Sequence, residues 1–468
     1  MNPRSGRSWL GLVAASGLVI AQIAAAPLQS GAAAAHIPYA DAKAIVDSLR
    51  QELLPAELRD RSAVAIESSW PEWVSSRDAQ IRARVAGGDH DSIGNLLLFG
   101  VTFTNQPRIR ARDILQLARQ SPAAGIVQRP AVQRRIDDMV AGIASPGTND
   151  RLQFVRGVIV AAGIDPATPE GRNRLRRYLE DRLTGVLAEY DAYARAPASD
   201  QSVRFGDRGL SSDTSLFPGF SIEQALQAIA AERLLEPGSV RRIAIVGPGL
   251  DFADKREGYD FYPQQTIQPF AVIDSLRRLG LAAGDELRTA TFDLSARVNQ
   301  HLEGAAQRAR AGHAYTLHLP RVTDAGWTPE LAAYWKRFGD RIGEPMTPAA
   351  APVEPSALEV RAVRVPPAVV LTVTPHDLNI VLQRLEPLAP SERFDLVIAT
   401  NLLVYYDVFE RSLALANVEK MLRPGGLFLA NNSTPVILPA SLESIGYSES
   451  VFSDQVNDRD RITWYRSR

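Results

Sequence analysis

Between residues 242 and 430, apolar runs of strand length alternate with stretches of helical periodicity, and this alternation restricts the fold more than any other feature of the chain. Repeated strand–helix units predict a parallel sheet with helices on both faces, because each parallel crossover lays its helix against the sheet. The predicted strands are 243–246, 287–292, 369–373, 394–399 and 427–430, and the predicted helices are 270–279, 296–309, 378–385 and 413–422.

An interruption at about residues 320–366 separates the second predicted helix from the third strand. It contains a short helical stretch with aromatic side chains, 331–338, and then a tract rich in proline and alanine, 345–355. We interpret this interruption as an insertion within an α/β domain that spans residues 236–468.

The preceding part of the chain, residues 36–196, predicts an all-α domain. Apolar side chains recur there at three- and four-residue spacing, and no alternating strand pattern of comparable strength is present. Glycine and proline, for example Gly87 and Gly88, are expected to separate the helical pieces. Residues 197–235 are then a linker and a lead-in helix between the two domains.

The first 35 residues predict a signal peptide or an N-terminal anchor. Two arginines precede an apolar run at 9–26, and small residues follow, which is the order of an export signal. The best cleavage position is the triple alanine at 33–35, and the apolar run also has borderline length for an uncleaved membrane anchor. The protein is therefore expected to be exported, in the periplasm or outside the cell, or held at a membrane by its N-terminus. It would be cytoplasmic if the start is misassigned.

Composition excludes several other classes of function. The 468 residues contain no cysteine and carry a formal net charge of −1, so disulfides, cysteine-based metal sites and nucleic-acid binding are not expected. After the N-terminus, no apolar segment is long enough to cross a membrane. The sequence Asp89-His90-Asp91 is interpreted as a loop or helix cap rather than a metal site, because adjacent helical residues face different ways.

Glycines and acidic residues follow the first two predicted strands. Gly247 and Gly249 come directly after a buried strand, where the missing Cβ lets the backbone approach a ligand; an ordinary tight turn is the alternative. Asp293 ends the second strand, where a carboxylate can accept hydrogen bonds from ribose hydroxyls. Capping of the next helix by Asp293 or Ser295 is the alternative.

The third and fourth strands also end in polar residues. Asp377 and Asn379 follow the third strand, where an acidic or amide side chain could bind an adenine amino group. The fourth strand leads into Asn401, Tyr405 and Tyr406. The central expectation is that the Asp293 carboxylate and the bare backbone at Gly247 and Gly249 meet around one nucleoside.

Two runs carry a resemblance to class I S-adenosylmethionine-dependent methyltransferases. Residues 394–407, FDLVIATNLLVYYD, resemble the fourth-strand motif of that family, and residues 422–428, LRPGGLF, resemble the turn before its fifth strand. The resemblance implies a Rossmann-like, mostly parallel sheet with an antiparallel terminal strand, the closing hairpin being formed by residues 444–452 and 461–465.

The same resemblance implies S-adenosylmethionine as cofactor and assigns the residues that hold it. Gly247 and Gly249 would approach the methionine end, and Asp293 would hold the ribose. Asp377 and Leu378 would flank the adenine. By the same resemblance, Asn401 would lie beside the sulfonium-bearing chain.

Two positions depart from the family pattern. The family usually has an acidic residue two places before its first glycine, where this chain has Ile245, and Asp251 stands where a third glycine is common. Asp251 could replace the missing acid, or it could repel the cofactor carboxylate. The polar loop that follows is interpreted as a lid or substrate contact, or as plain solvated surface; its residues include Asp254, Lys255, Arg256, Asp260 and Tyr262.

These observations predict a methyltransferase that acts on a small-molecule or protein acceptor. No catalytic base is assigned, since methyl transfer requires mainly alignment and desolvation, and Tyr405 and Tyr406 could face the substrate or simply pack. The alternative is an exported, non-catalytic protein that uses the fold to bind a ligand or partner, because the cofactor is a cytosolic metabolite. A nicotinamide-dependent dehydrogenase fits less well, because Phe252 occupies the last glycine position of the dinucleotide fingerprint.

Overall fold

The computed structural model describes residues 31–109, 123–195, 209–252, 259–323, 325–351, 358–431, 439, 441–455 and 458–468. Most of the predicted export segment, the first part of the predicted linker, and Asp254, Lys255 and Arg256 of the polar loop lie outside these residues. In the portion that is described, no helix has the length and apolar character needed to cross a membrane. Residues 32–468 form one unit by their contacts.

The central element is a seven-stranded sheet with the order β11-β12-β10-β9-β2-β3-β7. The pairs formed by β2, β3, β7, β9 and β10 are parallel, whereas β12 runs antiparallel to both β10 and β11. The strands are β2 (Arg242–Val246), β3 (Arg288–Asp293), β7 (Val373–Asp377), β9 (Phe394–Ala399), β10 (Leu422–Asn431), β11 (Leu442–Val451) and β12 (Arg459–Ser467). This arrangement confirms the predicted Rossmann-like sheet with an antiparallel terminal strand.

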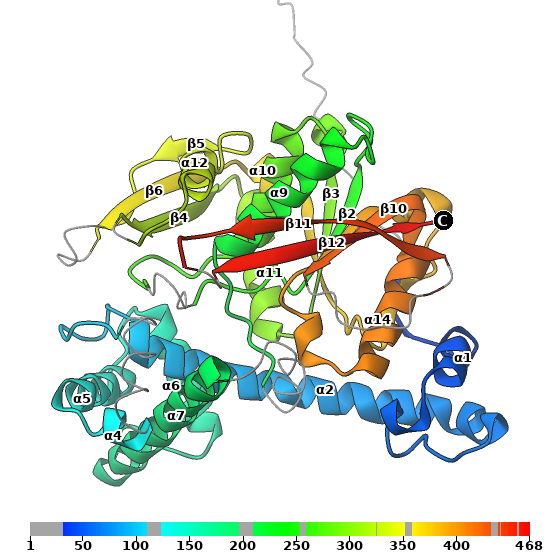
Figure 1. Ribbon diagram of the computed structural model, residues 1–468. Helices are drawn as coiled ribbons and strands as arrows, with labels where there is room; N and C mark the ends of the chain where they lie inside the picture. Colours follow the sequence, from blue (N-terminus) through cyan, green and yellow to red (C-terminus); the bar gives the residue numbers. More distant parts are fainter. Residues whose placement is uncertain are drawn as a thin grey trace, which may run out of the picture. The chain divides into compact units, whose positions relative to one another are not determined.

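Helices cover both faces of this sheet (Figure 1). Alternate side chains of β2 enter different cores: Ile243 and Ile245 pack with the helices α9, α10 and α11, whereas Ala244 and Val246 pack with α14 and the N-terminal helices. The helices concerned are α9 (Phe217–Ala231), α10 (Gln268–Arg278), α11 (Ala296–Arg310) and α14 (Val408–Met421). The strand β2 is therefore buried on both faces, as its unbroken apolar sequence predicts.

The third strand–helix unit differs from the prediction. Residues 367–370 form a short helix, α13 (Pro367–Val370), and the strand begins only at Val373. No helix follows β7, because the apolar residues at 378–385 enter a turn and then β8 (Gln383–Glu386). Ile380, Val381 and Leu382 are all buried, so their spacing reflects burial on every side rather than one face of a helix.

The predicted insertion is a small sheet with a helix. Its strands β4 (Tyr315–Val322), β5 (Glu344–Met346) and β6 (Leu358–Val365) pair antiparallel in the order β4-β6-β5, and α12 (Pro329–Arg337) is the predicted aromatic helix. The strands were not predicted. The insertion also begins earlier than expected, at Tyr315.

The N-terminal part contains a strand of a separate two-stranded sheet, a helix that packs on α14, and a helical bundle. Strand β1 (Ala33–His36) pairs antiparallel with β8, and α1 (Tyr39–Ser48) packs on α14. A chain cut after Ala35 would therefore keep only His36 of this strand. The bundle contains α4 (Ala123–Val127), α5 (Pro130–Ala144), α6 (Asp150–Ala161) and α7 (Pro169–Arg195).

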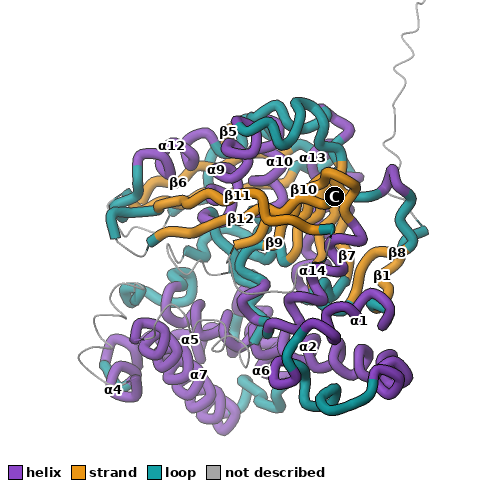
Figure 2. Tube along the Cα trace, turned by 45° about the vertical axis from the view of Figure 1, so that its right-hand side comes forward, coloured by secondary structure: helices purple, strands orange, loops and turns teal. Residues whose placement is uncertain are grey.

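One long helix, α2 (Ala63–Phe99), joins these two parts (Figures 1 and 2). Its first half, with Trp70 and Trp73, packs in the core beneath the sheet, whereas its second half packs among the helices of the bundle. The expectation that Gly87 and Gly88 interrupt the helix is wrong: α2 continues through both. Buried residues recur from Ile66 to Phe99, and their packing outweighs the roughly 1 kcal/mol by which each glycine disfavours the helix.

Candidate functional site

A cavity of ≈ 280 Å³ lies at the carboxyl ends of β2, β3 and β9. This is the edge where open α/β sheets bind ligands, because the strand order reverses there and leaves a crevice. The cavity is lined by residues at and after the strand ends, by the segment that leads into α9, and by single residues of α2, α9 and α10. These residues are Val85, 210–215, Pro218, Val246, Gly247, Gly249, Gln268, 292–295, 378–380, 400–402, Tyr405 and Tyr406.

The two glycines after β2 both have left-handed backbone conformations. The φ angles are 66° at Gly247 and 65° at Gly249, a region that side chains with a Cβ rarely adopt. A Cβ on Gly249 would lie 2.7 Å from the carbonyl oxygen of Ser212, whereas a Cβ on Gly247 would meet only Leu402, at 3.4 Å. Gly249 therefore allows a neighbouring backbone to approach closely, and Gly247 leaves space on the cavity side.

Asp293 is the last residue of β3 and lines the cavity. Its carboxylate accepts a hydrogen bond from the backbone N–H of Ser295 at 2.8 Å. Burial raises the pKa of Asp293 to about 6, although backbone N–H groups of Ser295, Gly249 and Leu294 act in the opposite direction. The side chain is thus an acceptor held in place and only partly exposed to solvent.

Leu378 and Asn401 also line the cavity. Asn401 has a φ of 57°, and its backbone N–H donates to Oδ1 of Asn431 at 2.7 Å. The Asn431 amide in turn donates to Oδ1 of Asn401. This reciprocal pair fixes the turn that follows β9. Five of the seven residues predicted to hold the cofactor therefore line one cavity, namely Gly247, Gly249, Asp293, Leu378 and Asn401.

The other two predicted residues, Asp251 and Asp377, lie elsewhere. Asp251 is 2% exposed, and its Oδ2 accepts from the hydroxyl of Tyr262 at 2.7 Å and from Nε2 of Gln265 at 2.9 Å. Asp377 is largely exposed and forms an ion pair with Arg82. Neither carboxylate lines the cavity, because each is already held by partners outside it.

Sequence reasoning missed the segment 209–215, which covers the glycine loop and was predicted as linker. The Leu250 N–H donates to the Ser212 carbonyl at 2.7 Å, and the Thr214 N–H donates to the Leu250 carbonyl at 2.9 Å. We call residues 209–215 the roof segment. It crosses α2 at Gly88, where a Cβ would lie 1.8 Å from the carbonyl oxygen of Leu210. The glycine pair was therefore the available signal, since close backbone crossing requires a missing Cβ.

The cavity is acidic. Among the described residues that line it, the only charged side chains are Asp213 and Asp293, with no lysine, arginine or histidine. Asp213 is held by two neutral groups of α2: its Oδ1 accepts from Oγ of Ser92 at 2.7 Å, and its Oδ2 accepts from Nδ2 of Asn95 at 2.9 Å. A cationic ligand would therefore be favoured over an anionic one.

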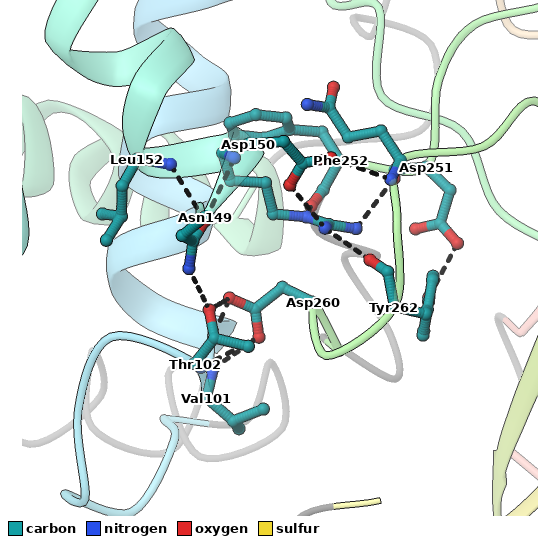
Figure 3. Close-up of polar contacts among 11 residues, drawn as sticks. Val101, Thr102, Asn149, Asp150, Leu152, Asp251, Phe252, Asp260 and Tyr262 are labelled. Carbon is teal, nitrogen blue, oxygen red and sulfur yellow. Dashed lines mark hydrogen bonds and ion pairs between the residues drawn. The ribbon is translucent and has the colours of Figure 1, made fainter. Parts of the chain in front are cut away.

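The loop between the glycines and α10 is fastened to the helical bundle (Figure 3). The buried guanidinium of Arg151 donates to the carbonyl oxygens of Phe252 and Tyr262, both at 2.6 Å. On the other side, Asp260 accepts from the backbone N–H of Val101 at 2.7 Å and from the hydroxyl of Thr102 at 2.6 Å. Asp260 and Tyr262 of the predicted polar loop thus anchor the loop to the bundle and do not line the cavity.

The sequence Asp89-His90-Asp91 lies within α2, so its expected placement in a loop or cap is wrong. Asp89 pairs with Arg297 at 3.5 Å, and Nδ1 of His90 contacts the hydroxyl of Tyr178. These partners give the run a role in packing α2 against α11 and α7. In the described part of the chain, no three acidic, histidine or cysteine residues group as a metal site would require.

The strand order and the antiparallel β12 are those of a methyltransferase-type Rossmann domain, which forms part of this chain. No protein-family model matches the sequence, and no curated protein matches it. Among solved structures, the N-methyltransferase NodS from Bradyrhizobium japonicum WM9 is similar at 14% identity and a TM-score of 0.26, covering 54% of this chain and 99% of that one.

Two further solved structures are similar to the same extent. The CcbJ methyltransferase from Streptomyces caelestis shares 11% identity at a TM-score of 0.25, over 58% of this chain and 97% of that one. TrmN from Thermus thermophilus shares 12% identity at a TM-score of 0.24, over 54% and 52%. Because these TM-scores are low, we assign the fold from the strand order of the sheet and not from these similarities.

Proposed function

We propose that the protein is an S-adenosylmethionine-dependent methyltransferase. The observation that carries the proposal is the acidic cavity in which Gly247, Asp293, Leu378 and Asn401 meet at the carboxyl ends of the sheet. Motif positions that are far apart in the sequence come together there, as a binding site for one nucleoside would require.

The residues present fit the chemical groups of this cofactor. Asp293 offers a carboxylate for two ribose hydroxyls, and Leu378 and Ile380 offer apolar contacts for an adenine ring. The cofactor supplies a methyl group on a positively charged sulfur, and the acidic lining favours that charge. A nicotinamide dinucleotide fits less well, because Phe252 stands at the last glycine position of its fingerprint and two carboxylates in the lining disfavour a pyrophosphate.

The remaining wall supports an acceptor site. Pro218, Tyr405 and Tyr406 line the same cavity, and the Arg84 guanidinium lies 5.7 Å from the ring centre of Tyr406. Burial raises the pKa of Tyr406, so its hydroxyl stays protonated and is a donor rather than a base. The chain's contribution to transfer is then alignment of donor and acceptor and exclusion of water.

Calorimetry with S-adenosylhomocysteine on the full chain tests cofactor binding. We expect wild-type protein to bind it and Asp293→Ala to bind roughly 10- to 100-fold more weakly, because a charge-assisted hydrogen bond contributes about 1.5–3 kcal/mol. Equal affinities would contradict the ribose assignment. No binding to wild-type protein at millimolar concentration would refute the proposed cofactor.

Catalysis is tested separately by transfer of tritium from methyl-labelled cofactor to candidate small-molecule and protein acceptors. Binding without transfer to any acceptor would favour the non-catalytic alternative, in which the cavity holds a ligand only. Mass spectrometry of native protein for retained adenosyl ligand, with its mature N-terminus read in the same sample, would show whether an exported or anchored chain meets this cofactor.

A further inference from the structure

We propose that Asp213, in the roof segment, binds the α-ammonium group of the cofactor's methionine moiety. This inference rests on the proposed function and extends it to a residue outside the family motifs. It also answers the question that Ile245 raises, because that residue stands where the family usually has an acid. In this protein, the acidic side chain would come from the roof segment instead of from β2.

The position of Asp213 follows from backbone pairing with the glycine loop. Asp213 and Leu250 form a parallel bridge, and the hydrogen bonds from Leu250 N–H to Ser212 O and from Thr214 N–H to Leu250 O lie on either side of it. Gly249 makes this approach possible, since a Cβ there would lie 3.0 Å from Cβ of Thr214. Asp213 is thereby placed at the glycine end of the cavity, where the methionine end is expected.

The charge of Asp213 has no cationic partner among the ion pairs found within the described residues. Its two hydrogen-bond donors, Ser92 and Asn95, are neutral, so they orient the carboxylate without cancelling its charge. A carboxylate has about four acceptor positions, and two donors leave room for an ammonium group. Burial raises the pKa of Asp89 against the opposing charge of Arg297, and the field of the Asp213 carboxylate adds to this rise.

The other nearby carboxylates are committed to different partners. Asp251, the sequence-based candidate for the missing acid, is buried against Tyr262 and Gln265 outside the cavity. Asp293 ends β3 and is assigned to the ribose. Asp213 is therefore the acidic side chain of the described cavity wall that remains for the amino group.

Two nucleosides, one with and one without the amino-acid part that carries the ammonium group, provide the test. S-adenosylhomocysteine carries the α-amino acid, whereas 5′-methylthioadenosine lacks it. Calorimetry on wild-type protein and on Asp213→Asn should show a roughly 10- to 100-fold loss of affinity for the first nucleoside and an unchanged affinity for the second, because one charged hydrogen bond is removed. The amide keeps a hydrogen bond to Ser92, whose hydroxyl can accept as well as donate.

The ratio of the two affinities separates binding from structural damage. Asp251→Asn is the matched control: it changes a carboxylate of the neighbouring glycine loop that lies outside the cavity, and the ratio should stay at the wild-type value. A parallel loss for both nucleosides in Asp213→Asn, or a changed ratio in Asp251→Asn only, would overturn the assignment to Asp213. If wild-type protein bound 5′-methylthioadenosine as tightly as S-adenosylhomocysteine, the nucleoside site would stand and this inference would fail. If it bound neither, the proposed function would fail as well.

Discussion

Replacing Gly88 by alanine tests whether the crossing of α2 and the roof segment shapes the cavity. Gly88 lies inside a helix, where alanine is intrinsically favoured by about 1 kcal/mol. At this position, however, the new Cβ would lie 1.8 Å from the carbonyl oxygen and 2.4 Å from the carbonyl carbon of Leu210. Helix propensity and packing therefore predict opposite results for one substitution.

The magnitudes decide in favour of packing. A carbon and a carbonyl oxygen normally stay about 3.3 Å apart, so one backbone must move by about 1.5 Å. Such a movement breaks the hydrogen bond from Leu210 N–H to the Arg84 carbonyl, which is 3.0 Å long. Overpacking costs about 1–3 kcal/mol and the lost hydrogen bond about 1 kcal/mol. After subtraction of the helix term, we expect Gly88→Ala to lower the free energy of unfolding by about 2 kcal/mol.

Urea unfolding gives this quantity, and Gly157→Ala is the matched control. Gly157 also lies inside a helix, α6, but a Cβ there meets no atom within 4 Å, so this variant should gain about 0.5–1 kcal/mol. Calorimetry with S-adenosylhomocysteine should show weaker binding for Gly88→Ala and none of this loss for Gly157→Ala. A Gly88→Ala protein as stable as the control variant would refute the crossing.

Three further predictions concern the site and its support. Asp293→Asn should stabilise the ligand-free protein by about 1–3 kcal/mol at pH 8. The folded pKa of Asp293, about 6, lies above the ordinary value, so the wild-type protein gains stability as pH falls from above 6 towards 4. The variant should lack this gain in pH-dependent urea unfolding. Arg151→Met should lower the free energy of unfolding by about 2–4 kcal/mol, because buried carbonyl groups lose a charged donor; a change within about 0.5 kcal/mol would contradict this. Asn431→Ala should free the turn at Asn401 and weaken binding of S-adenosylhomocysteine in calorimetry by at most roughly 30-fold, because the two lost hydrogen bonds together contribute about 2 kcal/mol. Unchanged binding would show that the turn holds its shape without Asn431.

Local patterns in the sequence determined the sheet and part of its site. Strands such as β2 and β9 are short apolar runs buried on both faces, and their limits agree with the prediction within one residue. Gly247 and Asp293 could be found because a residue that directly follows a parallel strand must lie at the ligand-binding edge. The prediction of a helix at 378–385 was wrong, because periodicity does not distinguish a buried turn from a helix.

The roof segment, the continuous α2 and the orientation of each carboxylate were decided only by the tertiary structure. Gly88 looked like a break in a helix, and Asp251 looked like a ligand, because the sequence does not show which distant backbone or side chain each one meets. Close crossing of two backbones gave Gly88 its role, and Tyr262 with Gln265 turned Asp251 away from the cavity. Contacts between residues more than 100 positions apart, such as Ser92 with Asp213, depend on the folded arrangement of the whole chain. Local propensity carries no information about them.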